Sequence, residues 1–295
     1  MKKMSITLER EIVQEITSNY SGLLKVEFYN KNGTFKQGIT LDKNNCSPVI
    51  YMDNIPELFP KMFADEKPDA GKLVSVLYEK MKNSVESFAA FKIAGELKGI
   101  DDTYILENVF PVLLPEEADV DVFIPFMDMK IAFKVRLKEH PDMMFTVNRT
   151  MMDRLTKAEL FLDSLKNVSR LSAPCLLRMS EMFSFLPYDG IGMKVLTNTE
   201  KLYGAAAIIY GKDMIKDLAE KEGSDIVIIP SSVHECLLLP YDKSMSFECL
   251  NAMVNEVNAS EVREEEILSD HVYMYDRQTD RIVTDAEYQK KIGKI

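Results

Sequence analysis

Residues 225–240, with the sequence DIVIIPSSVHECLLLP, constrain the fold of this chain more than any other stretch. Two apolar runs, rich in branched aliphatic side chains, are separated by a short break at residues 230–232. Short apolar runs that are bounded by turn residues are typical of buried strands. The stretch therefore predicts two paired strands inside a sheet, at residues 225–229 and 233–239.

The polar side chains at this break are candidates for function, because ionisable groups are rare inside so apolar a segment. In a regular strand over residues 233–239, Ser232 and His234 point to one face of the sheet and Glu235 points to the other. His234 and Glu235 would then serve different sites. A bulge at residues 230–232 could aim them together, because bulges redirect side chains.

Two catalytic interpretations can be built on these residues. In the first, Ser232 is a nucleophile and His234 is its base, although they lie two residues apart and the G-x-S-x-G turn is absent. In the second, His234 or Glu235 binds a zinc or iron ion together with Asp270 and His271. The H-E-x-x-H motif is absent, because a leucine stands where the second histidine is needed.

A structural interpretation requires no reaction. Ser231 and Ser232 satisfy backbone amides of the turn with their hydroxyl groups, and His234 and Glu235 lie beside them at a sheet edge. We favour this interpretation, because neither catalytic set of residues is complete.

A second polar segment, LSDHVYMYDR at residues 268–277, predicts the first strand of a C-terminal hairpin over residues 271–276 and 281–284. His271, Tyr273 and Tyr275 share one face of that strand. This face is either an aromatic recognition surface or a half-buried sheet surface, and the second interpretation is favoured.

The N-terminal third predicts a small β-meander covered by helices. An amphipathic helix over residues 6–19 precedes two strands joined by an Asn-Gly turn, and a third strand covers residues 47–53. A long helix follows Asp69, a good N-cap residue. We expect residues 1–100 to form one domain.

Residues 101–295 predict a larger α+β domain with mixed or antiparallel sheets covered by amphipathic helices. Thr156 and Glu159 form a capping box at the start of one helix. The other expected elements are strands over residues 105–114, 120–124, 129–137, 144–147, 193–197 and 205–210, and helices over residues 174–182, 212–221 and 247–257.

Charge and motifs exclude several function classes. The formal net charge is −11, and no run of lysine or arginine offsets it, so neither nucleic acid nor an anionic membrane is an expected partner. No apolar run is long enough to span a bilayer. No P-loop or G-x-G-x-x-G motif is present, and we expect no cofactor. Four cysteines without a C-x-x-C pair indicate core thiols in the reducing cytoplasm.

Several blocks carry a resemblance to a known family: SPVIYMD, NVFPVLLP, TNTEKLYGAAAIIY, DIVIIPSSVHECLLLP and LSDHVYMYDRQTDRI. Together they resemble an uncharacterised domain of unknown function that is frequent in gut-dwelling Gram-positive bacteria and their mobile elements. The resemblance covers residues 23–284 and implies no activity.

We therefore expect a soluble, non-catalytic binding or interaction protein whose partner is a protein. Because the family that the chain resembles is frequent in mobile elements, the resemblance implies that the chain is an accessory factor of a mobile element. The alternative is a hydrolase, with or without a metal ion, that is centred on His234 and His271 and assisted by Glu235 and Asp270.

Overall fold

The computed structural model describes residues 4–31, 34–41, 49–63, 68–90, 99–141, 143–152, 154–182 and 192–293. The chain forms two compact units, Met1–Gly99 and Ile100–Ile295. Both combine helices with antiparallel sheets, so the fold class is α+β, as predicted. That residues 1–100 and 101–295 are separate domains stays a prediction. No described helix has the length and apolar character that crossing a bilayer requires.

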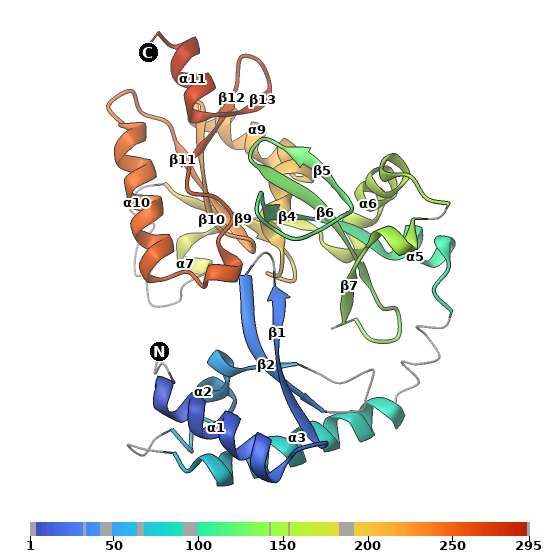
Figure 1. Cartoon of the computed structure of the whole chain (residues 1–295). Helices are drawn as coiled ribbons and strands as arrows, with labels where there is room; N and C mark the ends of the chain where they lie inside the picture. The colour runs from blue at the N-terminus through green and yellow to red at the C-terminus, as the bar shows by residue number, and fades with distance from the viewer. Residues whose placement is uncertain are drawn as a thin grey trace. The chain divides into compact units, whose positions relative to one another are not determined.

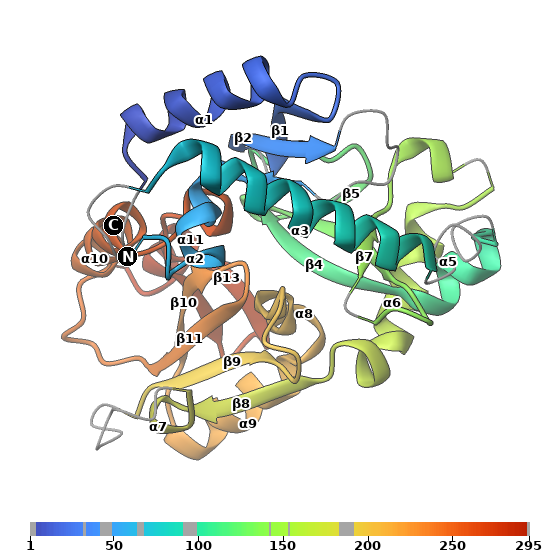
Figure 2. The ribbon, with the colours of Figure 1, turned by 90° about the horizontal axis from the view of Figure 1, so that it is seen from below.

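The N-terminal unit is built on a three-stranded antiparallel sheet in the order β1-β2-β3. Helix α1 begins after Ser5, and α3 begins after Asp69, whose carboxylate accepts the N–H of Lys72. Apolar side chains from both helices meet the sheet in one core, and the two helices lie side by side (Figure 2). The elements are α1 (Ile6–Asn19), β1 (Leu24–Lys31), β2 (Thr34–Leu41), β3 (Ile50–Tyr51), η1 (Met52–Asn54), α2 (Ile55–Leu58) and α3 (Ala70–Ala90).

The first sheet of the C-terminal unit has four strands, in the order β4-β6-β5, with β7 paired to the second half of β6. Helix α6 covers one face, and its capping box of Thr156 and Glu159 is present as predicted. The elements are α5 (Asp102–Asn108), β4 (Val109–Pro115), β5 (Phe123–Phe126), β6 (Met129–Arg136), β7 (Met144–Thr146), η2 (Arg149–Met151) and α6 (Lys157–Leu171).

The second sheet of this unit has six strands, in the order β13-β12-β10-β11-β9-β8, and the predicted pair β10 and β11 lies at its centre (Figure 1). The remaining elements are β8 (Pro174–Arg178), α7 (Met179–Met182), β9 (Lys194–Asn198), η3 (Gly204–Ala206), α8 (Ala207–Tyr210), α9 (Lys212–Glu222), β10 (Ile226–Ser232), β11 (Glu235–Pro240), α10 (Phe247–Ser260), η4 (Glu264–Glu266), β12 (Tyr273–Asp276), β13 (Arg281–Thr284) and α11 (Asp285–Lys291).

The two faces of the six-stranded sheet belong to different cores. Val227, Ile229 and Leu239 pack with α10 and α11. Ile228 and Leu238 instead pack with α9 and with apolar residues of the four-stranded sheet. This alternation of faces along both strands is why the segment consists of nearly continuous apolar runs.

Three predicted elements are wrong in type. Residues 174–178 form the edge strand β8 rather than a helix, and its first residue, Pro174, is tolerated at the end of an edge strand. Residues 204–210 are helical rather than extended, because three consecutive alanines favour a helix. Residues 102–108 form α5, which Asp101 caps, so strand β4 begins only at Val109.

Two other predictions fall partly or wholly outside the described part of the chain. The third N-terminal strand, predicted over residues 47–53, is described at Ile50–Tyr51, residues 52–53 belong to η1 instead, and residues 42–48 lie outside that part. The Asn-Gly turn of the first hairpin also falls outside it. On α10, Phe247 and Val254 are buried, whereas Met253 and Val257 are exposed.

Candidate functional site

The turn between β10 and β11 differs from the regular strand that was predicted. Pro230 pairs with Cys236 and Ser232 pairs with Glu235, so two steps along β10 face one step along β11. This register shift is a bulge at Ser231. His234 lies in the turn before β11, and alternation along a strand therefore does not determine where its side chain points.

Ser232 serves the turn rather than a reaction in this arrangement. Its hydroxyl oxygen accepts the backbone N–H of His234 at 3.0 Å and donates to the Glu235 carboxylate at 3.0 Å. The first contact has the geometry of an ST-turn. The nucleophile interpretation needs a bond from the serine hydroxyl to the imidazole of His234, and the hydroxyl proton is directed to Glu235 instead.

The imidazole of His234 faces the loop before η3, not Glu235. Its Nδ1 accepts the backbone N–H of Tyr203 at 3.0 Å, and its Nε2 lies 3.7 Å from a carboxylate oxygen of Glu266. The carbonyl of His234 accepts the Thr197 hydroxyl at 2.8 Å. Because Nδ1 accepts a hydrogen bond, the proton of the neutral ring lies on Nε2.

Asp270 and His271 lie in a segment that three asparagines of α10 hold in place. The Asn258 amide donates to the Asp270 carboxylate at 2.9 Å, and the Asn255 amide donates to the carbonyl of Asp270 at 3.0 Å. Asn251 accepts the N–H of Val272 at 2.9 Å. Spacings of four and three residues put these amides on one helix face, where they satisfy polar groups before β12.

A hydrogen-bonded cluster around Asp128 joins this segment to the turn between β5 and β6. The Tyr273 hydroxyl contacts Asp128 at 2.5 Å and Ser269 at 2.7 Å, and Ser269 donates to Asp128 at 3.1 Å. His271 Nε2 lies 3.6 Å from the same carboxylate. Burial, followed by the hydrogen bond to Asp128, raises the pKa of the Tyr273 phenol.

The two histidines therefore face different carboxylates, His234 towards Glu266 and His271 towards Asp128. Within the described ranges, no three His, Cys, Asp or Glu side chains are grouped so that they could hold a metal ion. The metal-dependent interpretation thus has no ligand set in this part of the chain, since zinc and iron need at least three convergent protein ligands.

The cysteines only partly match the expected core thiols. Cys236 is buried, Cys175 is half-buried and Cys249 is exposed, while Cys46 lies outside the described residues. Burial raises the pKa of both the Cys236 and the Cys175 thiols. A raised pKa lowers the thiolate fraction, which makes these two groups poor nucleophiles.

Sequence reasoning missed a row of cations on one face of β6 and its extension. Each cation lies over an aromatic ring, with distances to the ring centroid of 4.6 to 5.4 Å. The pairs are Lys130 with Phe123, Lys134 with Tyr203, Arg136 with Phe110 and Lys138 with Tyr104. The alternation in MKIAFKVRLK was the available signal, because residues two apart on a strand share a face.

The outer part of hairpin β1–β2 presents two exposed aromatic side chains. Phe28 and Phe35 are each 69% exposed. Phe28 pairs with Gln37 and Phe35 pairs with Asn30, so the two phenylalanines are diagonal neighbours on one face of the hairpin. Further along the same face, Leu24 and its partner Leu41 are buried in the N-terminal core; the apolar face thus continues beyond the helices that cover it.

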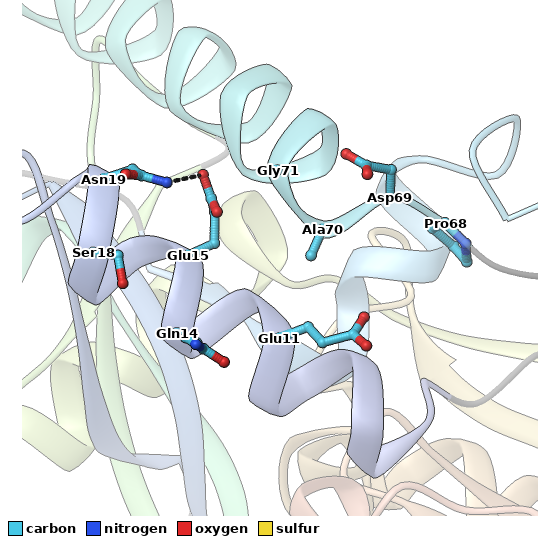
Figure 3. A pocket seen from close by; sticks show the side chains of 9 residues that line it. All are labelled: Glu11, Gln14, Glu15, Ser18, Asn19, Pro68, Asp69, Ala70 and Gly71. Carbon is cyan, nitrogen blue, oxygen red and sulfur yellow. Dashed lines mark hydrogen bonds between the residues drawn. The ribbon is translucent and has the colours of Figure 1, made fainter.

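A polar groove of about 490 Å³ lies between α1 and the start of α3 (Figure 3). Its lining includes Glu11, Glu15 and Asp69. Glu15 accepts the amide of Asn19, and Asp69 caps α3. A carboxylate at a helix N-terminus stabilises the helix, so Asp69 has a structural role without a ligand.

Comparison with known proteins places the chain in a family but gives it no activity. Neither the curated proteins nor the solved structures contain a match. The model of a family of unknown function matches residues 5–277, which is nearly the whole chain. The expected membership of an uncharacterised family is confirmed: the chain belongs to the family of unknown function DUF5688.

Proposed function

We propose that this chain is a non-catalytic binding protein that contacts a partner protein through the outer part of hairpin β1–β2. The observation that carries the proposal is the pair Phe28 and Phe35, which are adjacent on one face and 69% exposed. Adjacent exposed aromatic side chains are characteristic of protein interfaces, where aromatic residues supply much of the binding energy.

Burial of these two rings by a partner would contribute a useful part of a binding free energy. Full burial of a phenylalanine side chain is worth about 1.5–3 kcal/mol. Scaling this range by the exposed fraction of Phe28 and Phe35 gives about 2–4 kcal/mol for the pair. Such a contribution corresponds to a change in Kd of about 30-fold to 1000-fold.

The polar candidates of the C-terminal unit support a non-catalytic role. Ser232, His234 and Asp270 each bond to backbone or side-chain groups that hold a turn or a strand end. The net charge of −11 favours a protein over nucleic acid or an anionic membrane as the partner. In this proposal the interaction takes place in the cytoplasm. The role of accessory factor of a mobile element rests on the resemblance alone.

Site-specific photo-crosslinking in the organism of origin tests the proposal. A photoreactive phenylalanine analogue should crosslink to the same partner protein whether it replaces Phe28 or Phe35. Leu162 of α6 is the matched control, because it is an apolar side chain of similar exposure, 58%, in the other unit. Absence of an adduct at positions 28 and 35, or the same set of adducts at position 162, would contradict the proposed surface.

A competition arm separates binding from accidental proximity. Added in excess before irradiation, the unlabelled wild type should lower the yield of the adduct, whereas the double variant Phe28→Ser, Phe35→Ser should leave the yield unchanged. Because both side chains are exposed, we expect the free energy of unfolding of the double variant to lie within about 0.5 kcal/mol of the wild-type value.

A further inference from the structure

Two cations are largely buried on one face of the central strand β6. Lys134 and Arg136 are each 9% exposed and lie two residues apart. Lys134 donates to the Thr146 hydroxyl at 3.1 Å and lies 4.6 Å from the centroid of the Tyr203 ring. The Arg136 guanidinium lies 5.4 Å from the centroid of Phe110. For Arg136, an aromatic ring offsets only part of the cost of removing the guanidinium from water.

Among the described residues, Arg136 has only a loose anionic partner. This partner is the carboxylate of Glu200, at 3.9 Å, and the Glu200 side chain is 52% exposed. The buried Nε of Arg136 has no hydrogen-bond partner among the residues that the structure describes. A guanidinium is normally matched by a carboxylate or phosphate through two parallel hydrogen bonds. A loose ion pair and a free Nε leave that capacity unused.

The loop that carries Glu200 is held firmly in place. The Asn198 side chain accepts the N–H of Leu202 and donates to its carbonyl, and His234 accepts the N–H of Tyr203. Tyr203 has a left-handed backbone with φ +54°, which is costly for a large side chain. These contacts maintain the strained conformation that sets Tyr203 over Lys134. Strain that is maintained in this way is characteristic of functional loops.

We propose that Arg136 and Lys134 form a binding site for the oxyanion of a small ligand, a phosphate or carboxylate group that replaces the Glu200 carboxylate at the guanidinium. The bound oxyanion accepts hydrogen bonds from Arg136, and the ammonium group of Lys134 stabilises its charge. Glu200 then moves into solvent, which its half-exposed position permits. This site is independent of the hairpin surface proposed above, because it lies in the other unit of the chain.

Isothermal titration calorimetry of the full chain with inorganic phosphate, and separately with acetate, tests the site in chloride buffers of matched ionic strength. We expect the wild type to bind at least one of the two anions. Glu200→Gln removes the competing carboxylate and should tighten binding by up to about fivefold, which corresponds to about 1 kcal/mol for an exposed ion pair. Arg136→Gln should abolish binding.

Glu256→Gln is the matched control, because it makes the same change of charge at an exposed position of α10 in the same unit. It should bind like the wild type. If Arg136→Gln does not fold, Arg136→Lys takes its place and should weaken binding, because lysine keeps the charge but loses the planar fork.

The outcomes separate the proposal from general electrostatics. Binding of phosphate alone or acetate alone supports the site and identifies the ligand group. Absence of binding of both anions to the wild type overturns it. Equal tightening by Glu200→Gln and Glu256→Gln overturns it as well, because the effect would then arise from net charge. Unchanged anion binding by a folded Arg136 variant also overturns the proposed site.

Discussion

Gly204 lies where the C-terminal unit has no room for a methyl group. A Cβ at this position would lie 2.3 Å from the Thr197 hydroxyl, 2.6 Å from the carbonyl oxygen of His234 and 2.7 Å from the backbone nitrogen of Asn198. Two of these three atoms belong to the backbone of neighbouring strands and turns, which cannot rotate away. Gly204→Ala therefore has to displace the loop, the β10–β11 turn or both.

The cost can be worked out from these contacts. Overpacking a close-packed core costs about 1–3 kcal/mol. Thr197 is fully buried and donates to the carbonyl of His234, so moving it also breaks a hydrogen bond worth about 1–2 kcal/mol when its groups stay buried. We expect Gly204→Ala to destabilise the C-terminal unit by about 2–5 kcal/mol.

Hydrogen–deuterium exchange of peptides from β10 and β11 measures this loss within the C-terminal unit itself. Since each 1.4 kcal/mol is a factor of ten, exchange through unfolding should become faster by a factor of about 30 to 4000. Gly223→Ala is the control: Gly223 has a positive φ of 69°, but a methyl group there would meet no atom within 4 Å, so only backbone strain of about 1–2 kcal/mol is expected. Exchange of Gly204→Ala within threefold of the wild type would refute the close packing of this loop.

The polar contacts of the same unit lead to three further predictions. Tyr273→Phe should cost about 1.5–3 kcal/mol by urea unfolding, because it removes a buried hydrogen bond to the Asp128 carboxylate. Burial would raise the pKa of Asp276, but hydrogen bonds led by that from Lys291 outweigh it and hold the pKa below its ordinary value. This stabilisation is present above about pH 4 and is lost as the pH falls, so Lys291→Met should move the acid-unfolding midpoint to higher pH. Burial, and after it the hydrogen bond to a carboxylate, raise the pKa of the Tyr273 and Tyr288 phenols. The free energy of unfolding should therefore fall above about pH 10, where these phenols ionise in the unfolded chain only. Phenolate absorbance at alkaline pH checks this, because both groups should ionise only when the protein unfolds.

Local patterns in the sequence predicted the elements whose side chains alternate or cap in a regular way. The β10–β11 pair, helix α1 and the Thr156 capping box all follow from short-range rules. Strand β8 could not be predicted in this way, because its conformation depends on pairing with β9, about twenty residues further along the chain. A pairing partner at that separation overrides local propensity.

The candidate residues differ in the same way between what short-range patterns predict and what distant contacts decide. Sequence reasoning selected His234, but not the environment that decides its role, because Tyr203 and Glu266 approach it from distant parts of the chain. Arg136 escaped attention altogether, since a single arginine within an alternating strand is normally a solvent-facing residue. Arg136 is buried through contacts with distant residues: Phe110 lies against its guanidinium, and the loop that carries Glu200 approaches it.

These contacts connect the histidine selected from sequence with the proposed oxyanion site. A left-handed tyrosine costs about 1–2 kcal/mol, and the hydrogen bond from the N–H of Tyr203 to His234 helps to offset that cost. His234 therefore positions the loop without touching the ligand. We expect His234→Ala to weaken anion binding by loosening the loop, and His271→Ala, which faces Asp128 instead, to leave it unchanged. A calorimetric titration of both variants checks this order, and equal weakening by both would show that the loop is not held through His234.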